Sequence, residues 1–323
     1  MDEAPVIEVR NLTVRFPGQG GLAGPRSDPV TAVDNVSFTL QRGETLGLVG
    51  ESGCGKSTTG LAILNLIEAT SGSIRVLGKT IASLSSAERR AMRQRMQIVF
   101  QDPYSSLNPR QRVADIIRAP LDIHKLGAPA ERRDKVKQLM ARVGLRPDQA
   151  DNYPHQFSGG QRQRIGIARA LATQPELVIC DEPVSALDVS VQAQILNLLV
   201  ELQQEFGLSL LFISHDLSIV KHISDRVAVM YLGRIVEIAP RATLFASPQH
   251  PYTRLLLNSL PPRHPRDRRR QHLAADDAPD TQAPSRSGCR FSARCSMVMD
   301  VCLHKDPALT QRGVDHAVAC HHL

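Results

Sequence analysis

Residues 50–57 read Gly50-Glu51-Ser52-Gly53-Cys54-Gly55-Lys56-Ser57, and this stretch, the phosphate loop, decides the fold. It fits the pattern G-x-x-x-x-G-K-[ST], in which glycines let the backbone curl until successive N–H groups point at phosphate oxygens. Residues 44–49 before it read as a strand, and residues 58–68 after it have the apolar spacing of a helix whose N-terminus favours the same anion. Lys56 is then able to reach the β- and γ-phosphates, and the Ser57 hydroxyl to ligate Mg²⁺. The stretch predicts a nucleoside triphosphate site.

The rest of the composition narrows the class of protein. A length of 323 residues allows one large or two ordinary domains. The net charge of +7 suits nucleic acid or anionic lipid, but four Tyr, eight Phe and no Trp offer few rings for base stacking, so a nucleic-acid surface is the weaker interpretation. The acidic start does not read as a signal peptide, and no run approaches the ~20 apolar residues of a membrane span. We expect a cytosolic protein, or one at the cytosolic face of a membrane.

A second part of the predicted site follows the apolar run at 176–183. Continuous apolar residues indicate a parallel strand covered on both faces, and this one delivers Asp181 and Glu182 to its carboxyl end, where ligands bind in open α/β sheets. One carboxylate there would equally suit a helix N-cap, but two beside a phosphate loop favour hydrolysis. Asp181 would hold Mg²⁺, directly or through water, and Glu182 would polarise the attacking water. His215 ends the next buried strand, 208–214, which favours a place facing the γ-phosphate.

A second glycine-bearing stretch, the signature loop, lies at 158–161 and opens a helix predicted at 162–172. Its N–H groups and serine hydroxyl make another anion site, although the short pattern is a weak signal alone. Strand signals vanish between 103 and 161, so we expect an all-helical insertion in an α/β chain, with helices at 113–124 and 130–143. The other expected elements are strands at 6–16, 31–40, 72–78 and 97–100, a strand pair at 225–238, a charged helix at 86–96, and a helix at 192–206 with a core stripe of Ile195, Leu199, Leu202 and Phe206.

Four of the six cysteines lie in the last 35 residues, at Cys289, Cys295, Cys302 and Cys320. In a reducing compartment this crowding suggests a metal or cluster more than disulfides. The spacing contains no paired C-x-x-C and does not match ferredoxins, so zinc and an iron–sulfur cluster both stay open. Nearby histidines would matter for zinc: His304, His316, His321 and His322. Cys54 and Cys180 read as packing residues, and 261–287 reads as a linker or surface loop.

As an ordered set, these motifs resemble the ATP-binding subunits of ABC transporters, most closely those of bacterial dipeptide and oligopeptide importers. The resemblance covers nearly the whole chain, and its subfamily pointers are residues 101–109, His250-Pro251-Tyr252-Thr253 and the four-cysteine tail. It implies an α/β P-loop NTPase core with a mixed sheet, an antiparallel β subdomain, an inserted α-helical subdomain and a small Cys-rich C-terminal region. The implied segments are an ATP-binding core at 1–102 and 162–245, a helical subdomain at 103–161, and an extension at 246–323 with a linker at 261–287 and the four-cysteine region at 288–323.

The resemblance also assigns roles to residues. Phe16 is similar to the aromatic that stacks on adenine, displaced upstream by an insertion at 17–29 whose role the sequence leaves open. Gln101 is similar to the Q-loop residue, with a part in catalysis and in holding Mg²⁺ beside Ser57 and Asp181, and His215 to the switch histidine. The implied ATP-binding residues of one chain are Phe16, Gly50, Glu51, Ser52, Gly53, Cys54, Gly55, Lys56, Ser57 and Thr58. Those implied to act in trans are Ser158, Gly159, Gly160, Gln161 and Asp188.

In such a family, two ATPase domains would pack head to tail, so that each signature loop completes the site of its partner. The implied partners are a second ATPase subunit (a paralogue in preference to a second copy), two membrane permease subunits and, indirectly, an extracytoplasmic peptide-binding protein, with no nucleic acid. The implied location is the cytoplasmic face of the inner membrane, peripherally, and the implied cofactors are ATP, Mg²⁺ and a [4Fe–4S] cluster, with Zn²⁺ as the alternative.

Other classes explain the motifs less well. A nucleic-acid-directed ABC-class ATPase is expected to carry a long coiled-coil insertion or a second ATPase domain, which the sequence lacks. A P-loop kinase leaves the signature loop and His215 without purpose. Nickel or glutathione in place of peptide stays open.

Overall fold

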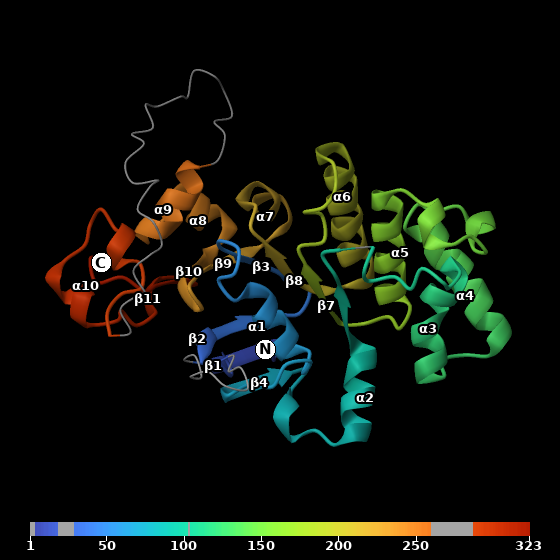
Figure 1. The fold of residues 1–323 in the computed structure, drawn as a ribbon, viewed down its shortest axis with the longest axis horizontal. Helices are drawn as coiled ribbons and strands as arrows, with labels where there is room; N and C mark the ends of the chain where they lie inside the picture. The colour runs from blue at the N-terminus through green and yellow to red at the C-terminus, as the bar shows by residue number, and fades with distance from the viewer. Residues whose placement is uncertain (1–3, 19–28, 103, 260–286) are drawn as a thin grey trace, which may run out of the picture.

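The computed structural model describes residues 4–18, 29–102, 104–259 and 287–323, and these form two β-sheets with helices around them (Figure 1). The smaller sheet has the strand order β2–β1–β4–β5, and the larger has the order β11–β12–β10–β9–β3–β8–β7–β6. The insertion expected at 17–29 falls mostly outside the described residues, as does nearly all of the expected linker at 261–287.

The large sheet is mixed, as predicted. Its neighbouring parallel strands are β6 (Met96–Val99), β7 (Leu177–Asp181), β8 (Ser209–Ser214), β3 (Thr45–Val49) and β9 (Arg226–Tyr231). Antiparallel strands complete it: β10 (Arg234–Pro240), β12 (His316–Val318) and β11 (Thr310–Gly313). Since β3, β6, β7 and β8 run in one direction, the residues that follow each of them meet at one edge of the sheet.

Both faces of the large sheet are buried at its central strands. In β7 and β8, one set of alternating side chains packs toward the small sheet, and the other set packs toward the helices on the opposite face. The first set includes Ile179 and Ile213, and the second includes Cys180 and Phe212. This double burial is the reason that the two strands read as continuous apolar runs.

The small sheet is antiparallel and consists of β1 (Ile7–Phe16), β2 (Val30–Leu40), β4 (Ser71–Val76) and β5 (Lys79–Thr80), followed by a 3₁₀ turn at Ile81–Ser83. Helix α1 (Lys56–Ile63) contacts β2 on one side and β7 and β8 on the other, so it lies between the two sheets (Figure 1). The sequence predicted that this helix reaches residue 68, but it ends at Ile63. It ends because Asn65 adopts a left-handed conformation, and the N–H of Leu66 turns back to the carbonyl of Leu61.

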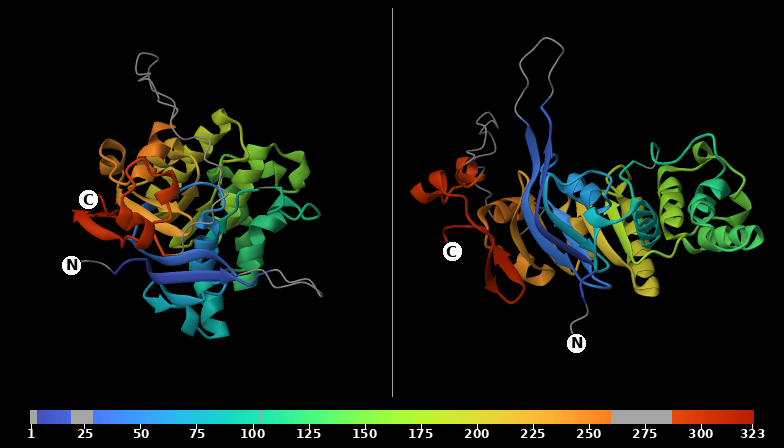
Figure 2. Two further views of the ribbon diagram at one scale, coloured as in Figure 1. Left: turned by 60° about the vertical axis from the view of Figure 1, so that its left-hand side comes forward. Right: turned by 90° about the horizontal axis from the view of Figure 1, so that it is seen from below.

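The helical insertion forms a lobe at one end of the molecule (Figure 2). After α2 (Ser86–Arg95) and β6, it contains α3 (Val113–His124), α4 (Pro129–Arg142) and 3₁₀ turns at Pro147–Gln149 and Pro154–Gln156. Helix α5 (Gly159–Leu171) begins three residues earlier than predicted. The reason is a capping box, because the Ser158 Oγ accepts a hydrogen bond from the Gln161 N–H and the Gln161 Oε1 accepts one from the Ser158 N–H.

Helices α6 (Val189–Phe206) and α7 (Leu217–Ile223) cover the face of the large sheet opposite α1 (Figure 1). The predicted core stripe of α6 is right for Ile195, Leu199 and Leu202, which are buried. It is wrong for Phe206, which is 39% exposed. Phe206 is the last residue of the helix, before the left-handed Gly207, and it lies past the end of the packed stripe, in an open groove beside Leu139 of α4.

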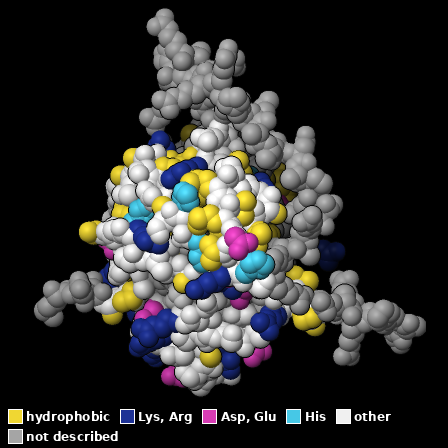
Figure 3. Space-filling view, turned by 90° about the vertical axis from the view of Figure 1, so that its left-hand side faces the viewer, with side chains coloured by type: hydrophobic (Ala, Val, Ile, Leu, Met, Phe, Trp, Pro, Cys, Tyr) yellow, Lys and Arg dark blue, Asp and Glu magenta, His cyan; other side chains and the backbone are white. Residues whose placement is uncertain are grey.

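The C-terminal region, defined here as residues 246–259 and 287–323, packs onto the end of the large sheet. After α8 (Arg241–Ala246) it contains α9 (Pro251–Asn258), a 3₁₀ turn at Ser292–Arg294 and α10 (Asp300–His304). Strand β12 pairs with β10 through Glu237 opposite Val318, so the region extends the core sheet. Figure 3 shows hydrophobic side chains gathered on its outer face, and Val298, Val301 and Leu303 are exposed. No helix among the described residues has the length and apolar character to cross a membrane.

Candidate nucleotide-binding site

The phosphate loop leaves β3 at the crowded centre of the molecule, and this crowding explains its glycines. Gly55 has φ of 105°, in the left-handed region, and a Cβ there would collide with the carbonyl oxygen of Ala32. A Cβ on Gly50 would collide with the carbonyl oxygen of Met230. Neither position accepts another residue without moving the neighbouring backbone.

Lys56 is the first residue of α1, and its side chain returns over the loop. The residue is 4% exposed, and its Nζ donates to the carbonyl oxygens of Gly50 and Glu51, each at 2.8 Å. Its ammonium is therefore held within the curl of the loop, beside the backbone N–H groups that suit phosphate.

Ser57 and Asp181 bring two oxygen ligands together. The Ser57 Oγ donates to the Asp181 Oδ1 at 2.8 Å, which joins the phosphate loop to the end of β7. Burial raises the pKa of Asp181, and the charge of Glu182 adds to this rise, whereas the Ser57 hydrogen bond and the charge of Lys56 oppose it. The pair fits Mg²⁺, a hard cation that typically takes one or two protein oxygens and completes its shell with water and substrate phosphates.

Glu182 lies at the centre of three strand ends. Its Oε2 is 3.1 Å from the Nε2 of Gln101, which follows β6, and 3.0 Å from the Nδ1 of His215, which follows β8. Its side chain is only 12% exposed, whereas that of His215 is 52% exposed. The structure therefore brings together the three residues that the sequence singled out for catalysis.

The backbone of Glu182 is unusual as well. Its φ is 46°, a left-handed conformation that costs a non-glycine residue about 1–3 kcal/mol. The Glu182 N–H donates to the carbonyl of Ile213 at 3.0 Å, and the Ser185 N–H donates to the carbonyl of Glu182. These bonds hold the turn that aims the carboxylate across the sheet edge.

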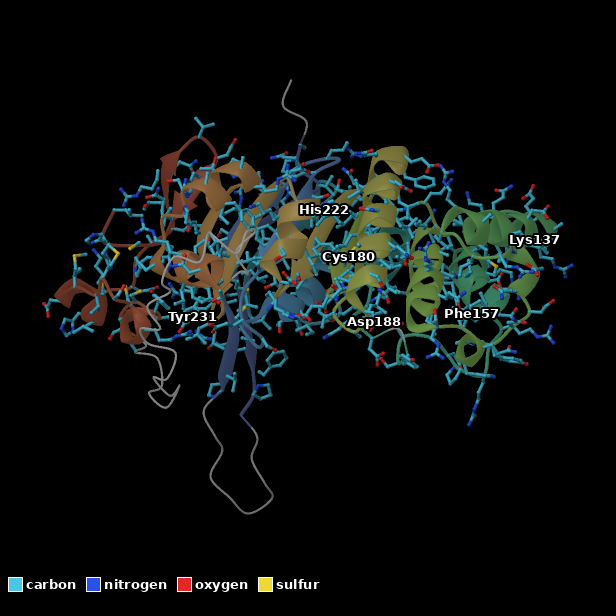
Figure 4. The ribbon with its side chains drawn as sticks, turned by 90° about the horizontal axis from the view of Figure 1, so that it is seen from above. Lys137, Phe157, Cys180, Asp188, His222 and Tyr231 are labelled. Carbon is cyan, nitrogen blue, oxygen red and sulfur yellow. The ribbon has the colours of Figure 1, made fainter. Side chains whose placement is uncertain are left out.

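The signature loop is not part of this cluster. Its capping box uses its own polar groups, and across the described residues no hydrogen bond joins 158–161 to the phosphate loop. Gly160 is packed so closely against Val191 of α6 that a Cβ would collide with it. Asp188 precedes α6 and makes no side-chain cap bond. Figure 4 shows Phe157, which precedes the signature loop, and Tyr231, at the end of the strand that pairs with β3, on opposite sides of Asp188.

Phe16 ends β1, opposite Val30, and the residue is 39% exposed. This leaves the ring accessible for stacking, although nothing within the described residues brings it to the phosphate loop. Its role with adenine stays a prediction.

Two residues in contact with the phosphate loop were not expected from the sequence. The Glu51 N–H donates to the hydroxyl of Tyr252 at 3.0 Å, and the Arg294 guanidinium pairs with the Glu51 carboxylate at 3.0 Å. Tyr252 belongs to the His250-Pro251-Tyr252-Thr253 motif, which the sequence offered only as a subfamily pointer. Arg294 immediately precedes Cys295 and carried no signal of its own.

The four C-terminal cysteines lie near one another without forming a metal site. Burial raises the pKa of Cys289, and the other three thiols of the group contribute to this rise. Across the described ranges, however, no set of three or more His, Cys, Asp and Glu side chains is arranged to hold a metal ion. The predicted iron–sulfur cluster and the zinc alternative are therefore not supported by this geometry.

Two of the histidines near those cysteines have other partners. The Nε2 of His316 is 2.9 Å from the Oε1 of the buried Glu237, and the Nε2 of His321 is 2.8 Å from the carbonyl oxygen of Lys305. Cys54 and Cys180 are buried at 3% and 0% exposure, as expected of packing residues, and burial raises the pKa of Cys180 to about 12.

The chain matches two protein-family models. The model described as "ABC transporter" matches residues 33–185, and the model described as "Oligopeptide/dipeptide transporter, C-terminal region" matches residues 236–302. One curated relative is the oligopeptide transport ATP-binding protein AppF of Bacillus subtilis (strain 168). It is 49% identical over 323 residues, which cover 99% of this chain and 98% of the relative.

Solved structures agree with this similarity. CbiO1 of Clostridium perfringens, part of the ABC transporter complex cbiONQ, superposes with a TM-score of 0.64 at 29% identity, covering 76% of this chain and 92% of that one. The ATP-binding cassette MJ0796, as a dimer in a post-hydrolysis state bound to ADP and Pi, superposes with a TM-score of 0.63 at 27% identity, covering 73% of this chain and 98% of that one.

Proposed function

Because the chain belongs to the family of ATP-binding subunits of ABC peptide importers, we propose that it hydrolyses ATP to drive the uptake of dipeptides or oligopeptides. Peptide as the cargo is supported by what AppF is named for and by the family of the C-terminal match. Nickel and glutathione are the alternatives that the sequence left open.

One observation supports hydrolysis above all others. The Glu182 carboxylate contacts both Gln101 and His215 at the sheet edge beside the phosphate loop. Glu182 would orient the attacking water and accept its proton as the oxygen bonds to the γ-phosphorus and the bond to ADP breaks. His215 would donate a hydrogen bond to the γ-phosphate, and Gln101 would keep Glu182 in place. Lys56 would bind the β- and γ-phosphates.

Ser57 and Asp181 would hold the Mg²⁺, which neutralises phosphate charge when it is bound. We also propose Gln101 as a Mg²⁺ ligand. Its amide nitrogen contacts Glu182, so its amide oxygen would be the ligand atom.

The site is completed in trans. We infer that Ser158, Gly159, Gly160 and Gln161, with Asp188, contact the nucleotide held by a partner ATPase in a head-to-tail pair. The separation of the signature loop from the phosphate loop supports this arrangement, as does the dimeric state of the MJ0796 structure. A paralogue is the preferred partner over a second copy.

The remaining partners are two permease subunits and, through them, an extracytoplasmic peptide-binding protein. The loop after Gln101 and the helical lobe are the proposed docking surface for the permeases, which would place the chain peripherally at the cytoplasmic face of the inner membrane. The proposed domain boundaries are a core at 1–102 and 162–245, a helical subdomain at 103–161 and an extension at 246–323. Co-purification with two hydrophobic membrane subunits would test these assignments together.

A metal centre on the four cysteines also remains a proposal, with [4Fe–4S] preferred over Zn²⁺. It rests on the resemblance of the tail to the C-terminal cysteine region of peptide-importer ATPases, and the described thiols are not arranged as a ligand set. Visible absorption with iron and zinc analysis on anaerobically purified protein tests it. Colourless, metal-free protein would remove both options.

The decisive experiment for hydrolysis is Glu182→Gln in the assembled importer. We expect ATP to bind as in the wild type while turnover falls about 10³-fold, in the range for loss of a general base, and the ATPase pair to stay closed. Glu201→Gln, an exposed substitution of the same kind on α6, is the matched control. ATPase activity near the wild-type rate in Glu182→Gln would remove the role of this carboxylate.

A further inference from the structure

Glu51, the second residue of the phosphate loop, is held by the C-terminal region. Its N–H donates to the hydroxyl of Tyr252, 201 residues further along the chain. Its two carboxylate oxygens lie 3.0 and 3.1 Å from the Nη1 of Arg294, 243 residues away. Both contacts reach the loop from the side of the C-terminal region, and neither residue is among those expected to touch ATP.

Tyr252 is a rigid partner. It is fully buried in an aromatic cluster with Tyr231 and Phe291, whose ring centroids lie 4.5 and 5.5 Å from its own. The Tyr252 N–H donates to the Nδ1 of His250, which caps α9. Burial raises the pKa of Tyr252, so the phenol keeps its proton. Its hydroxyl therefore occupies a fixed point against the loop, because moving it would disturb a packed cluster.

Arg294 supplies a charge. Burial lowers its pKa, but hydrogen bonds to Tyr231 and Glu51 outweigh that effect and leave the pKa raised. Glu51 is the one acidic residue of the phosphate loop. Unpaired, its carboxylate would repel a triphosphate bound to the same loop, and the guanidinium removes most of that repulsion.

The two contacts act on the beginning of the loop and reach it from outside the loop. Within the loop, the Lys56 Nζ donates to the carbonyls of Gly50 and Glu51. Further along, the Cys54 carbonyl accepts a hydrogen bond from the Gly233 N–H at 2.8 Å, and Ser57 contacts Asp181. The beginning of the loop depends on Tyr252 and Arg294 for its outer contacts. Since a loop whose competent shape is only partly populated binds its ligand more weakly in proportion, these contacts bear on affinity.

We propose that Tyr252 and Arg294 are positioning residues for the phosphate loop, through which the C-terminal region sets the affinity of the site for ATP. This inference rests on the proposed function, because it takes ATP as the ligand of that loop. It connects the C-terminal region, including the segment that carries Cys289 and Cys295, to the nucleotide through the phosphate loop. It predicts effects on ATP binding and KM, with little effect on kcat at saturating ATP.

The first test is Tyr252→Phe, which keeps the aromatic packing and leaves the Glu51 N–H without its acceptor. We expect the Kd for Mg·ATP, titrated on the full-length chain, to rise about tenfold. Leaving this part-buried donor unpaired disfavours the competent shape of the loop, at a cost of about 1–3 kcal/mol, and 1.4 kcal/mol is a factor of ten. The matched control is Thr253→Val. It removes a buried hydroxyl from the next residue of α9, and that hydroxyl has no hydrogen-bond partner within the described residues. Its Kd should stay at the wild-type value.

The second test concerns charge. Arg294→Gln should raise the Kd about threefold, a modest effect because the pair is partly exposed, and Arg294→Lys should restore most of the affinity. The control is Arg254→Gln, an exposed arginine of α9 that contacts Pro248 and Met297 and does not contact the phosphate loop. In the Glu51→Gln background, Arg294→Gln should raise the Kd much less, because the carboxylate charge that Arg294 compensates is already absent.

These outcomes separate the inference from the proposed function. If the wild-type chain binds no ATP, the proposed function fails first. If it binds ATP, and Tyr252→Phe and Arg294→Gln bind it as tightly as their controls do, the inference is wrong while the function stands. A fall in kcat with an unchanged KM in the assembled importer would also overturn it, because it would mean that the two residues act on the chemical step.

Discussion

The phosphate loop and the signature loop are both glycine-bearing turns at the start of a helix, yet their surroundings differ. The phosphate loop is enclosed: Lys56 is buried against the loop carbonyls, Ser57 contacts Asp181, and Tyr252 holds the Glu51 N–H. The signature loop is half open, and its polar side chains bond to each other in a capping box. The chain itself supplies the phosphate loop with a cation and with oxygen ligands, and it supplies neither to the signature loop.

This difference teaches that a helix N-terminus is a place for an anion only when other groups complete it. The phosphate loop has a cation, a hydroxyl and a carboxylate within its own chain. The signature loop offers N–H groups and Ser158 but no cation, so it suits a phosphate that another subunit already holds. The predictions below test this division between a site complete in one chain and a contribution made in trans.

The largest expected effect is on the complete loop. Lys56→Ala should weaken ATP binding to the isolated chain about 100-fold, because hydrogen bonds to charged groups contribute about 1.5–3 kcal/mol each and 1.4 kcal/mol is tenfold. Equilibrium titration with Mg·ATP measures it. Lys137→Ala, on α4 in the helical lobe (Figure 4), is the control and should bind normally. Equal affinity in Lys56→Ala and the wild type would mean that the phosphate loop is not the site.

A smaller effect is expected in trans. Ser158→Ala should leave ATP affinity of the isolated chain unchanged and lower turnover of the assembled pair about tenfold, the worth of one hydrogen bond to a charged phosphate. The serine is also an N-cap, so unfolding free energy should fall by about 1 kcal/mol.

Ser85→Ala is the matched control for Ser158→Ala, because Ser85 caps α2 through the same kind of capping box with Glu88. It should show the same loss of stability and no loss of turnover. If the two variants lost turnover equally, the signature loop would be a helix cap and no more. If Ser158→Ala weakened binding in the isolated chain, the division between the two loops would be wrong.

The smallest effect concerns stability and pH. Because the pKa of Asp181 is raised above 3.8 in the fold, chiefly by burial, its stabilising contribution is present below the ordinary carboxyl pKa and is lost as the pH rises through the raised value. Asp181→Asn should therefore melt at a higher temperature than the wild type at pH 7, without nucleotide or Mg²⁺, and this advantage should shrink as the pH falls toward 3.8. Thermal unfolding across pH measures it. An advantage that does not change with pH would contradict it. The signature loop has no titratable side chain and should show no such dependence.

Sequence reasoning succeeded where the signal is local or periodic. The strands β3, β7 and β8 were readable because buried parallel strands are apolar throughout, and this fixed which residues follow them at the ligand-binding edge. It failed at element ends. Phe206 shares the helical period of α6 but lies beyond the packed surface, and α1 stops early at a left-handed Asn65 that the apolar spacing does not reveal.

The phosphate loop, the two carboxylates, His215 and the family were determined by the sequence alone. The loop and the carboxylate pair are short local patterns, and His215 directly follows an apolar strand. The tertiary structure alone decided that Gln101 and His215 meet on one oxygen of Glu182, that the C-terminal region extends the core sheet, and that Tyr252 and Arg294 reach Glu51. These contacts join residues up to 243 positions apart, and no local pattern encodes them. They arise because packing strands and helices into one sheet and one core brings distant segments to the same edge.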